Sequence, residues 1–374
     1  MNKRPLSVFF IIMIMAIVPG CSDRLDLEES TNNLALGLDL DNENNLLVYS
    51  SSPSYGRDIK KTTLEIETQS QTVRQSREQQ DQFAPGVVTG KKVQVMLIGK
   101  RILEHEDWFP ILDPFFRDMK NPLTARVVAF DGSISDIIYL QPKDQPMLPL
   151  LLRGMVDTKS TRSETAKTTL QKLHWQMYER GVTPYISEIQ LDTAKQIRLA
   201  GVTLLDHKGK YATSLSAEET VLLQILNKNA KKPVSLTLPI PGQKKSGPFH
   251  TDHLSISVQG MKPKIKTSYN QSKFLFDINI KMTAGLTERL FPFDVRKNRK
   301  ELEKMISEHV QKQFKNLIKN FQKHQIDPIG LGLYARAHEY RQYKKVEDHW
   351  GEALSEADIH VSVKVILGSI GPMK

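Results

Sequence analysis

The sequence predicts an α+β fold of several domains with mostly antiparallel sheets, and three features indicate this class. Apolar runs at 34–40 and 46–50 flank the polar segment D-N-E-N-N, which is typical of a β-hairpin. Residues 359–365 alternate between apolar and polar side chains, as a half-buried strand does. Residues 299–322 repeat apolar side chains every three or four positions, which predicts a helix with one buried face.

The N-terminal half predicts strands that alternate with short helices. Residues 65–82, rich in Gln, Thr and Ser, fit either an exposed strand that passes into a polar helix or a mobile loop, and both stay open. A helix is expected at 165–180, with Gly181 as its C-terminal cap. The other elements expected here are buried strands at 93–98 and 125–130, helix at 101–106 and 108–116 broken by Pro110 and Pro114, and a short helix or turn at 132–140.

The C-terminal half predicts a strand at 196–205, a turn, and a helix that begins at the capping-box pattern of Ser216 and Glu219. Residues 231–250 contain four prolines and two glycines, so we expect a loop or a segment at the edge of a domain there. Further strands are expected at 254–258, 264–269 and 274–282. The final strand, 359–367, is expected to pair with the strand at 274–282.

The long helix at 299–322 is the clearest helix in the sequence, because its apolar stripe is continuous. The stripe consists of Leu302, Met305, Ile306, Val310, Phe314, Leu317, Ile318 and Phe321. We expect three parts in the chain: a signal peptide at 1–20, an N-terminal α/β region at 21–200 that is one unit or two subdomains, and a C-terminal domain at 201–374 that contains this helix and the final strand.

The N-terminus has the pattern of a secretory signal peptide. Lys3 and Arg4 precede an apolar run at 6–18, which at 13 residues is too short for a transmembrane helix. Val18-Pro19-Gly20-Cys21 is similar to a bacterial lipobox, and Cys21 is the one cysteine of the chain. We therefore expect cleavage between Gly20 and Cys21 and attachment of a diacylglyceryl group to the Cys21 sulfur.

Composition narrows the class of protein. The chain is 39% hydrophobic and 25% charged, as ordinary globular proteins are, and its net charge is +10. Removal of Lys3 and Arg4 with the signal leaves a charge of +8. For an exported chain, this charge favours attraction to an anionic lipid surface over nucleic-acid binding. We expect no nucleic-acid partner.

The sequence carries no strong catalytic or metal-binding motif. It lacks G-x-S-x-G and H-E-x-x-H, and G-V-V-T-G-K-K at 86–92 departs from a phosphate-binding loop in spacing and in context. His250, Asp252 and His253 are the one compact group of metal-ligand side chains, and solvated loop residues are the favoured interpretation. His309 is interpreted as a histidine at the boundary of the helix stripe. We expect no catalytic residue, no metal and no cofactor.

Several motifs, in the same order along the chain, resemble the Ger(x)C family of spore germination lipoproteins. Near the start these are G-C-S-D-R at 20–24, with Ser22 where the family usually has tryptophan, and L-A-L-G-L-D at 34–39. V-M-L-I-G-K-R-I-L at 95–103 and F-F-R-D at 115–118 follow. The C-terminal third contributes D-P-I-G-L-G-L-Y at 327–334, Trp350 and the alternating last strand.

The resemblance implies the three-domain mixed α/β fold of the C subunits of nutrient germinant receptors. It implies a non-enzymatic subunit, held by lipid on Cys21 at the outer face of the spore inner membrane, that acts with a multi-spanning A subunit and a transporter-like B subunit. Whether the Cys21 amino group is also acylated stays open. A different hypothesis, a lipoprotein that itself captures a small nutrient, also stays open, because a binding pocket leaves no spacing signature. An exported hydrolase that uses His250 or Asp252 is the third hypothesis.

Overall fold

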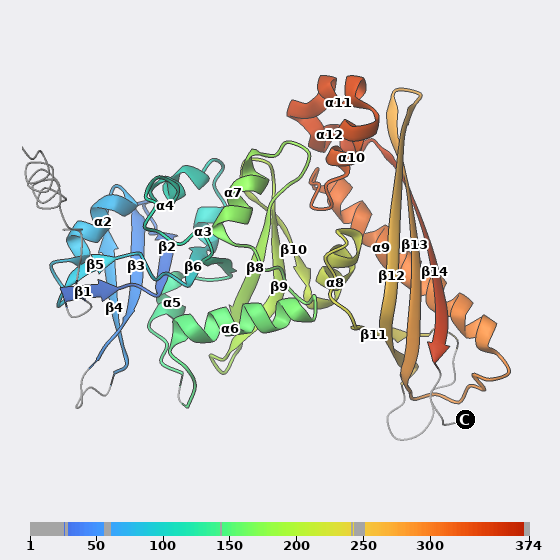
Figure 1. Cartoon of the computed structure of the whole chain (residues 1–374), viewed down its shortest axis with the longest axis horizontal. Coiled ribbons are helices and arrows are strands. Elements are labelled where there is room, and N and C mark those ends of the chain that lie inside the picture. The colour runs from blue at the N-terminus through green and yellow to red at the C-terminus, as the bar shows by residue number, and fades with distance from the viewer. Residues whose placement is uncertain are drawn as a thin grey trace, which may run out of the picture.

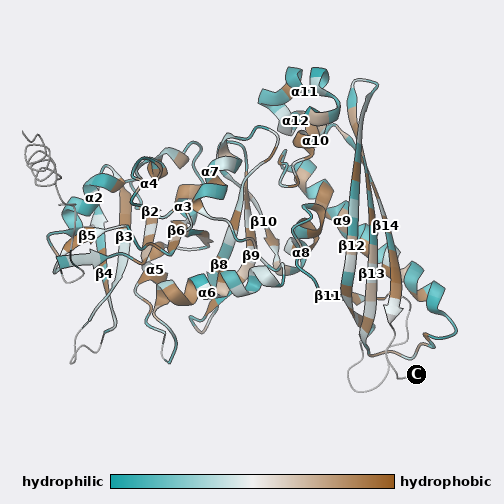
Figure 2. Cartoon of the chain, viewed as in Figure 1, coloured by the Kyte–Doolittle hydropathy of each residue, from teal (hydrophilic) through white to brown (hydrophobic). Residues whose placement is uncertain are grey.

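The protein is elongated and contains two main sheets that lie at different places along its length (Figure 1). It is seen here in a computed structural model, which describes residues 26, 29–55, 61–142, 144–240, 242 and 251–369. The described segments form an eight-stranded sheet, a four-stranded sheet and a two-stranded parallel pair. Helices α2 (Val73–Gln80) and α11 (Tyr340–Val346) consist mostly of hydrophilic residues (Figure 2). Strands β12 (His253–Asn270) and β13 (Lys273–Arg289) alternate between hydrophilic and hydrophobic residues (Figure 2).

The eight-stranded sheet has the order β10-β9-β8-β7-β6-β2-β3-β4. Strands β2, β6, β7 and β8 run parallel, and antiparallel strands extend the sheet on both sides. Its strands are β2 (Ala35–Leu40), β3 (Leu46–Pro53), β4 (Thr63–Gln69), β6 (Val95–Gly99), β7 (Arg126–Phe130), β8 (Tyr185–Leu191), β9 (Ile197–Leu205) and β10 (Tyr211–Ser216). The small pair joins β1 (Ser30–Asn32) to β5 (Val87–Thr89).

Helices cover both faces of this sheet. On one face α5 (Ile134–Ile138) and α6 (Leu148–Thr161) pack against the apolar side chains of β2, β6 and β7. The opposite face is covered by α3 (Lys100–Leu103), η2 (Phe109–Leu112), α4 (Asp113–Arg117) and α7 (Leu170–Tyr178). All five residues of β6 and all five of β7 are buried, because a parallel strand between two helical layers has no solvent face.

The four-stranded sheet has the order β11-β12-β13-β14, and its β13–β14 pair is parallel. Its remaining strands are β11 (Val234–Pro239) and β14 (Asp358–Ser369). Its core is shared with α8 (Ala217–Leu226) and with the long helix α9 (Arg299–Lys323). The predicted apolar stripe of α9 faces this core, and all of its members are buried except Met305, which is partly buried. The chain then forms α10 (Leu331–His338), α11, η3 (Glu347–His349) and α12 (Trp350–Ser355).

Most expected elements are confirmed. The hairpin is β2–β3, and the undecided segment 65–82 is strand β4 followed by α2, so the first alternative holds. The capping box of Ser216 and Glu219 opens α8. The final strand pairs with β13, as expected.

Four expectations are wrong. Residues 231–250 are not loop throughout, because buried Val234, Leu236 and Leu238 alternate with polar residues to make strand β11. The two strands expected at 254–258 and 264–269 are one strand, β12, which stays continuous across a register shift at Gly260.

The other two corrections concern the helix expected at 165–180. It begins at Leu170, because the Thr169 side chain caps the Lys172 amide. It ends at Tyr178, so Gly181 is not its cap.

Candidate functional site

The expected lipid-attachment site lies outside the described residues. Gly20 and Cys21 precede Asp26, and the first strand, β1, begins at Ser30. Within the described ranges, no helix has both the length and the apolar character needed to cross a bilayer. Cleavage and acylation at Cys21 therefore stay predictions.

The residues considered for metal binding do not form a site in the described chain. His250 lies outside the described residues, whereas Asp252 and His253 are adjacent, with 3.1 Å between Oδ1 and Nδ1. Among the described residues no group of three or more His, Cys, Asp or Glu side chains is placed to hold a metal ion. His309 lies on α9, where burial lowers its pKa and the charges of Lys312 and His253 add to this effect.

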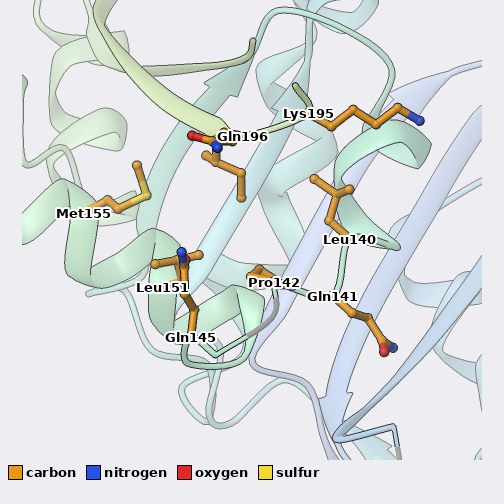
Figure 3. A pocket seen from close by; sticks show the side chains of 9 residues that line it. Leu140, Gln141, Pro142, Gln145, Leu151, Met155, Lys195 and Gln196 are labelled. Atoms are coloured by element: carbon orange, nitrogen blue, oxygen red, sulfur yellow. The ribbon is translucent and has the colours of Figure 1, made fainter. Parts of the chain in front are cut away.

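A cavity of about 480 Å³ opens beside α6 and the β8–β9 turn (Figure 3). Leu151 and Met155 of α6 form part of its apolar wall, and in Figure 3 the ends of Lys195 and Gln141 extend away from these two side chains. The described residues of the lining are Leu140, Gln141, Pro142, Gln145, Leu151, Met155, Lys195, Gln196 and Ile197. Among the described residues this lining offers amides and one ammonium group and contains no carboxylate, hydroxyl or thiol, so the cavity could hold a small polar molecule.

Two motifs of the N-terminal half meet at a buried carboxylate. Asp39, at the end of L-A-L-G-L-D, is 1% exposed and accepts hydrogen bonds from the amides of Ile134 (2.8 Å) and Leu40 (2.9 Å) and from the Ser133 hydroxyl (3.3 Å). Gly99, from V-M-L-I-G, lies against it: a Cβ atom at Gly99 would lie 2.4 Å from Asp39 Oδ1. Two motifs that are 60 residues apart therefore fit together at the carboxyl ends of β2 and β6.

The motifs of the C-terminal third meet at a second buried carboxylate. Asp327 is 1% exposed and accepts hydrogen bonds from the amide of Gly330 (2.7 Å), the amide of Gly332 (2.8 Å) and the indole Nε1 of Trp350 (2.8 Å). Gly330 has φ of 81°, a left-handed conformation that glycine adopts at little cost. This conformation turns the chain into α10 with its amides directed at the carboxylate. We call Asp327, Gly330, Gly332 and Trp350 the Asp327 joint.

The Asp327 joint also connects the two main sheets. Thr183, two residues before β8, donates its amide to the Asp327 carbonyl (2.9 Å) and accepts from the Asp327 amide through its hydroxyl (3.0 Å). Beside it, a Cβ atom at Gly332 would lie 2.7 Å from the Gly181 Cα atom. Gly181, expected as a helix cap, therefore allows the backbones of the two regions to approach closely.

Ion pairs surround this junction. Arg336 of α10 makes two hydrogen bonds to the Glu179 carboxylate, at 2.9 and 3.1 Å. Arg180, from the segment before β8, pairs with two carboxylates of the C-terminal region, Glu347 at 2.8 Å and Asp348 at 2.6 Å. Such pairs are weak individually, but a bidentate pair and its neighbours fix the relative orientation of two surfaces.

Burial raises the pKa of both Asp39 and Asp327, while the hydrogen bonds that each accepts act in the opposite direction. The Asp327 carboxylate accepts from the N–H groups of Gly330, Gly332 and Trp350, and these groups can only donate. These carboxylates are closed off from solvent, so they have no access to a substrate. Their arrangement is suited to fixing backbone segments and not to acid–base catalysis.

The motifs that contain these residues do not predict that the residues meet. One signal in the sequence could have indicated the Asp327 joint: an acidic residue, Asp327, followed closely by two glycines and, further along the chain, by a tryptophan. A buried carboxylate needs several donors, and amides at glycine-rich turns supply them without side-chain obstruction.

Comparisons with known proteins cover almost the whole chain. A family model described as "Spore germination protein N-terminal domain" matches residues 23–191, and one described as "Spore germination B3/ GerAC like, C-terminal" matches residues 200–371. Spore germination protein B3 of Bacillus subtilis (strain 168) is 21% identical over 378 residues, which cover 97% of each chain.

A solved structure has the same fold. The crystal structure of the GerBC protein matches with a TM-score of 0.59 at 17% identity and covers 89% of this chain and 96% of that chain. The predicted fold class, a multidomain mixed α/β protein with mostly antiparallel sheets, is confirmed. The two family models match in succession, and the resemblance inferred from the motifs agrees with them: the chain belongs to the Ger(x)C family of spore germination proteins.

Proposed function

We propose that this chain is the C subunit of a nutrient germinant receptor and is needed for spores to germinate in response to nutrients. The observation that carries the proposal is the succession of two spore germination family models over residues 23–191 and 200–371. In this proposal the subunit is not an enzyme and acts with the A and B membrane subunits of the same receptor. The closed environments of Asp39 and Asp327 support this, because the family motifs serve packing.

The proposed location is the outer face of the spore inner membrane, with diacylglyceryl-modified Cys21 as the anchor. The lipobox-like sequence at 18–21 and the short apolar run before it support cleavage between Gly20 and Cys21. A single acyl chain gives only marginal membrane binding, and two or more hold a protein stably.

We also propose the division into 1–20, 21–200 and 201–374, within a three-domain fold. The change of family model between residues 191 and 200 supports the second boundary. Strands β9 and β10 nevertheless belong to the eight-stranded sheet, which extends to Ser216. The boundary at 200/201 therefore lies inside strand β9 of that sheet.

Substitution of the anchor residue tests the proposal. In spores that carry Cys21→Ala as the sole copy, we expect the protein to leave the membrane fraction and the nutrient response to fall. Ser22→Ala, which keeps the cysteine, is the matched control and should behave as the wild type. Full membrane retention together with normal germination of the Cys21→Ala spores would contradict the proposal.

The cavity beside α6 favours a second candidate, a lipoprotein that binds a small nutrient itself. Its volume of about 480 Å³ lies within the range of small-molecule sites. Calorimetry of the chain from residue 22 onward with amino acids and sugars decides between the two. Binding heat that disappears in Met155→Trp would favour direct capture, and no heat with any of them favours the receptor-subunit role alone.

A further inference from the structure

Three lysines lie directly opposite one another across three neighbouring strands of the C-terminal sheet. Lys262 of β12 pairs in register with Lys281 of β13, and Lys281 pairs with Lys364 of β14. All three side chains are exposed, whereas the residues on either side of Lys281 and Lys364 are buried in the core and Met261, before Lys262, is partly buried against it. Adjacent strands are about 4.8 Å apart, so three ammonium groups project from one narrow band of the sheet surface. We call these residues the lysine row.

The surroundings add positive charge and little negative charge. Lys264 lies two residues along β12 from the row, opposite Asn279 of β13, which in turn faces Ser362 of β14. The nearest carboxylate on this face is one step further, at Asp277, opposite Lys266 and 3.3 Å from His360 Nδ1. In the part of the chain that the structure describes, none of the three row lysines forms an ion pair.

Folding does not account for the lysine row. Like charges directly opposite each other destabilise a sheet. Lysines on an edge strand can block aggregation, and this could explain Lys262 where β11 no longer covers β12. Lys281 lies on an interior strand, however. The β14 edge is already covered by α9, whose Gln311, Ser307 and Glu303 side chains accept from three β14 amides.

The row is better suited to an anionic layer than to a protein surface. Cores of protein interfaces are depleted in lysine and enriched in aromatic residues. Of the large apolar side chains exposed in the described chain, only Ile366 lies on these three strands. Phosphate headgroups of a bilayer present negative charge over a wide plane, and each lysine near such a plane adds to the attraction.

We propose that the outer face of β12, β13 and β14, centred on Lys262, Lys281 and Lys364, binds the anionic headgroups of a lipid bilayer. This inference deepens the proposed membrane location and rests on it. Strand β1, which follows the expected anchor residue, and strand β14 lie at opposite ends of the long axis (Figure 1). A second contact at the lysine row would therefore hold the elongated molecule along the membrane, with both sheets close to its surface.

Vesicle binding tests the proposal without the acyl group. The chain from residue 21 onward with Cys21→Ser keeps every described residue and cannot be acylated. It is mixed with vesicles of phosphatidylcholine alone or of phosphatidylcholine and phosphatidylglycerol in equal amounts, and bound protein is measured by sedimentation. We expect binding to the anionic vesicles only, weakened by added salt because screening reduces the attraction.

The decisive comparison is between two triple variants that lose the same charge. Lys262→Gln, Lys281→Gln and Lys364→Gln together should weaken binding about a hundredfold, since each lysine is worth about a factor of five. The matched control changes Lys312, Lys315 and Lys319, exposed on α9, to Gln and should stay within a few-fold of the parent chain. The row variant should unfold at the same temperature or higher, because repulsion is removed.

The proposal is overturned if the two triple variants bind anionic vesicles equally well, or if the parent chain binds neutral and anionic vesicles equally well. It is also overturned if the parent chain binds no vesicles but binds polyglutamate, an acidic polypeptide, in a way that the lysine-row substitutions abolish. The last outcome would assign the face to an acidic polypeptide. Because the tested chain carries no acyl group, these outcomes are independent of the Cys21→Ala result.

Discussion

The two buried carboxylates, Asp39 and Asp327, share a design but serve different parts of the molecule. Each is 1% exposed, accepts from a backbone amide at the start of a helix, and lies against a glycine that leaves no room for a Cβ atom. Around Asp39, however, the partners belong to the eight-stranded sheet and the α5 helix that covers it. Around Asp327 the contacts extend to Thr183 and Gly181, in the other region of the chain.

Asp39 therefore fixes the packing of helix α5 on one sheet, whereas Asp327 fixes the contact between the two sheets. Removal of the Asp39 contacts would loosen one layer of helices against one sheet. Removal of the Asp327 contacts would loosen α10 and at the same time the backbone contact with the segment before β8. The family motifs thus mark the construction of each sheet in one case and the relative position of the two sheets in the other.

The largest expected effect comes from loss of the Asp327 carboxylate. Asp327→Ala leaves two buried amides and one indole N–H without their acceptor, at a cost of about 3 to 5 kcal/mol in the free energy of unfolding. Because the joint connects the two sheets, calorimetry should show a lowered transition for the C-terminal region that separates from that of the eight-stranded sheet.

Glu308→Ala is the control for loss of a carboxylate. Glu308 is exposed on α9 and 3.9 Å from Lys304, so its substitution should change the free energy of unfolding by less than about 0.5 kcal/mol. If Asp327→Ala unfolded in one unshifted transition, the joint would not carry the connection between the sheets.

A smaller effect is expected from a methyl group at the junction. In Gly332→Ala the new Cβ atom would lie 2.7 Å from the Gly181 Cα atom and 2.8 Å from Trp350 Nε1, and we expect about 1 to 3 kcal/mol of destabilisation. Gly99→Ala forces the same kind of clash inside the eight-stranded sheet, at 2.4 Å from Asp39 Oδ1. The two variants should therefore destabilise different regions, as hydrogen exchange followed region by region can show.

Gly154→Ala is the matched control for both glycine substitutions. Gly154 lies within α6, and a Cβ atom there meets nothing within 4 Å. Alanine should stabilise this helix by about 0.5 to 1 kcal/mol. Equal destabilisation by all three alanines would mean that the lack of room for a Cβ atom is not what requires glycine at 99 and 332.

The sequence was sufficient for elements whose signal is local. The stripe of α9, the alternation in β14 and the capping box at Ser216 each depend on neighbours a few residues away, and each is confirmed. Helix α6 was not predicted, although Leu148, Leu152 and Val156 recur at four-residue spacing and are buried. Polar residues and Gly154 interrupt its pattern, so its helical state depends on packing against the sheet.

The rest depended on contacts between distant segments. The meeting of Asp39 with Gly99 and of Asp327 with Trp350 cannot be deduced from spacing, because each requires the sheet order and the course of the chain. The lysine row shows the same limit. Lys262, Lys281 and Lys364 lie opposite one another only because β12, β13 and β14 adopt one particular register.

The smallest effect should come from a third carboxylate, Asp157 of α6, whose pKa shifts in the opposite direction. Burial acts to raise the pKa of Asp157, but the hydrogen bonds and charge of Arg126 at 2.8 and 3.0 Å, together with Lys167, outweigh it and lower the pKa. A carboxylate with a lowered pKa adds stability above its unfolded pKa of 3.8 and loses that contribution as pH falls through the folded value. Asp39 and Asp327, with raised pKa values, should show the opposite dependence.

Urea unfolding of the wild type and of Asp157→Asn at pH 7 and at pH 3 checks the sign. The variant keeps one acceptor oxygen for Arg126, so we expect it to be less stable by about 1 kcal/mol at pH 7. The gap should narrow at pH 3, because this pH lies below the unfolded pKa of 3.8 and the unfolded chain takes up a proton there that the folded Asp157 resists. For Asp39→Asn, the wild type should instead gain relative to the variant as pH falls. A gap for Asp157→Asn that stays constant between the two pH values would mean that the Arg126 pair does not lower its pKa, and the contrast with the two buried carboxylates would fail.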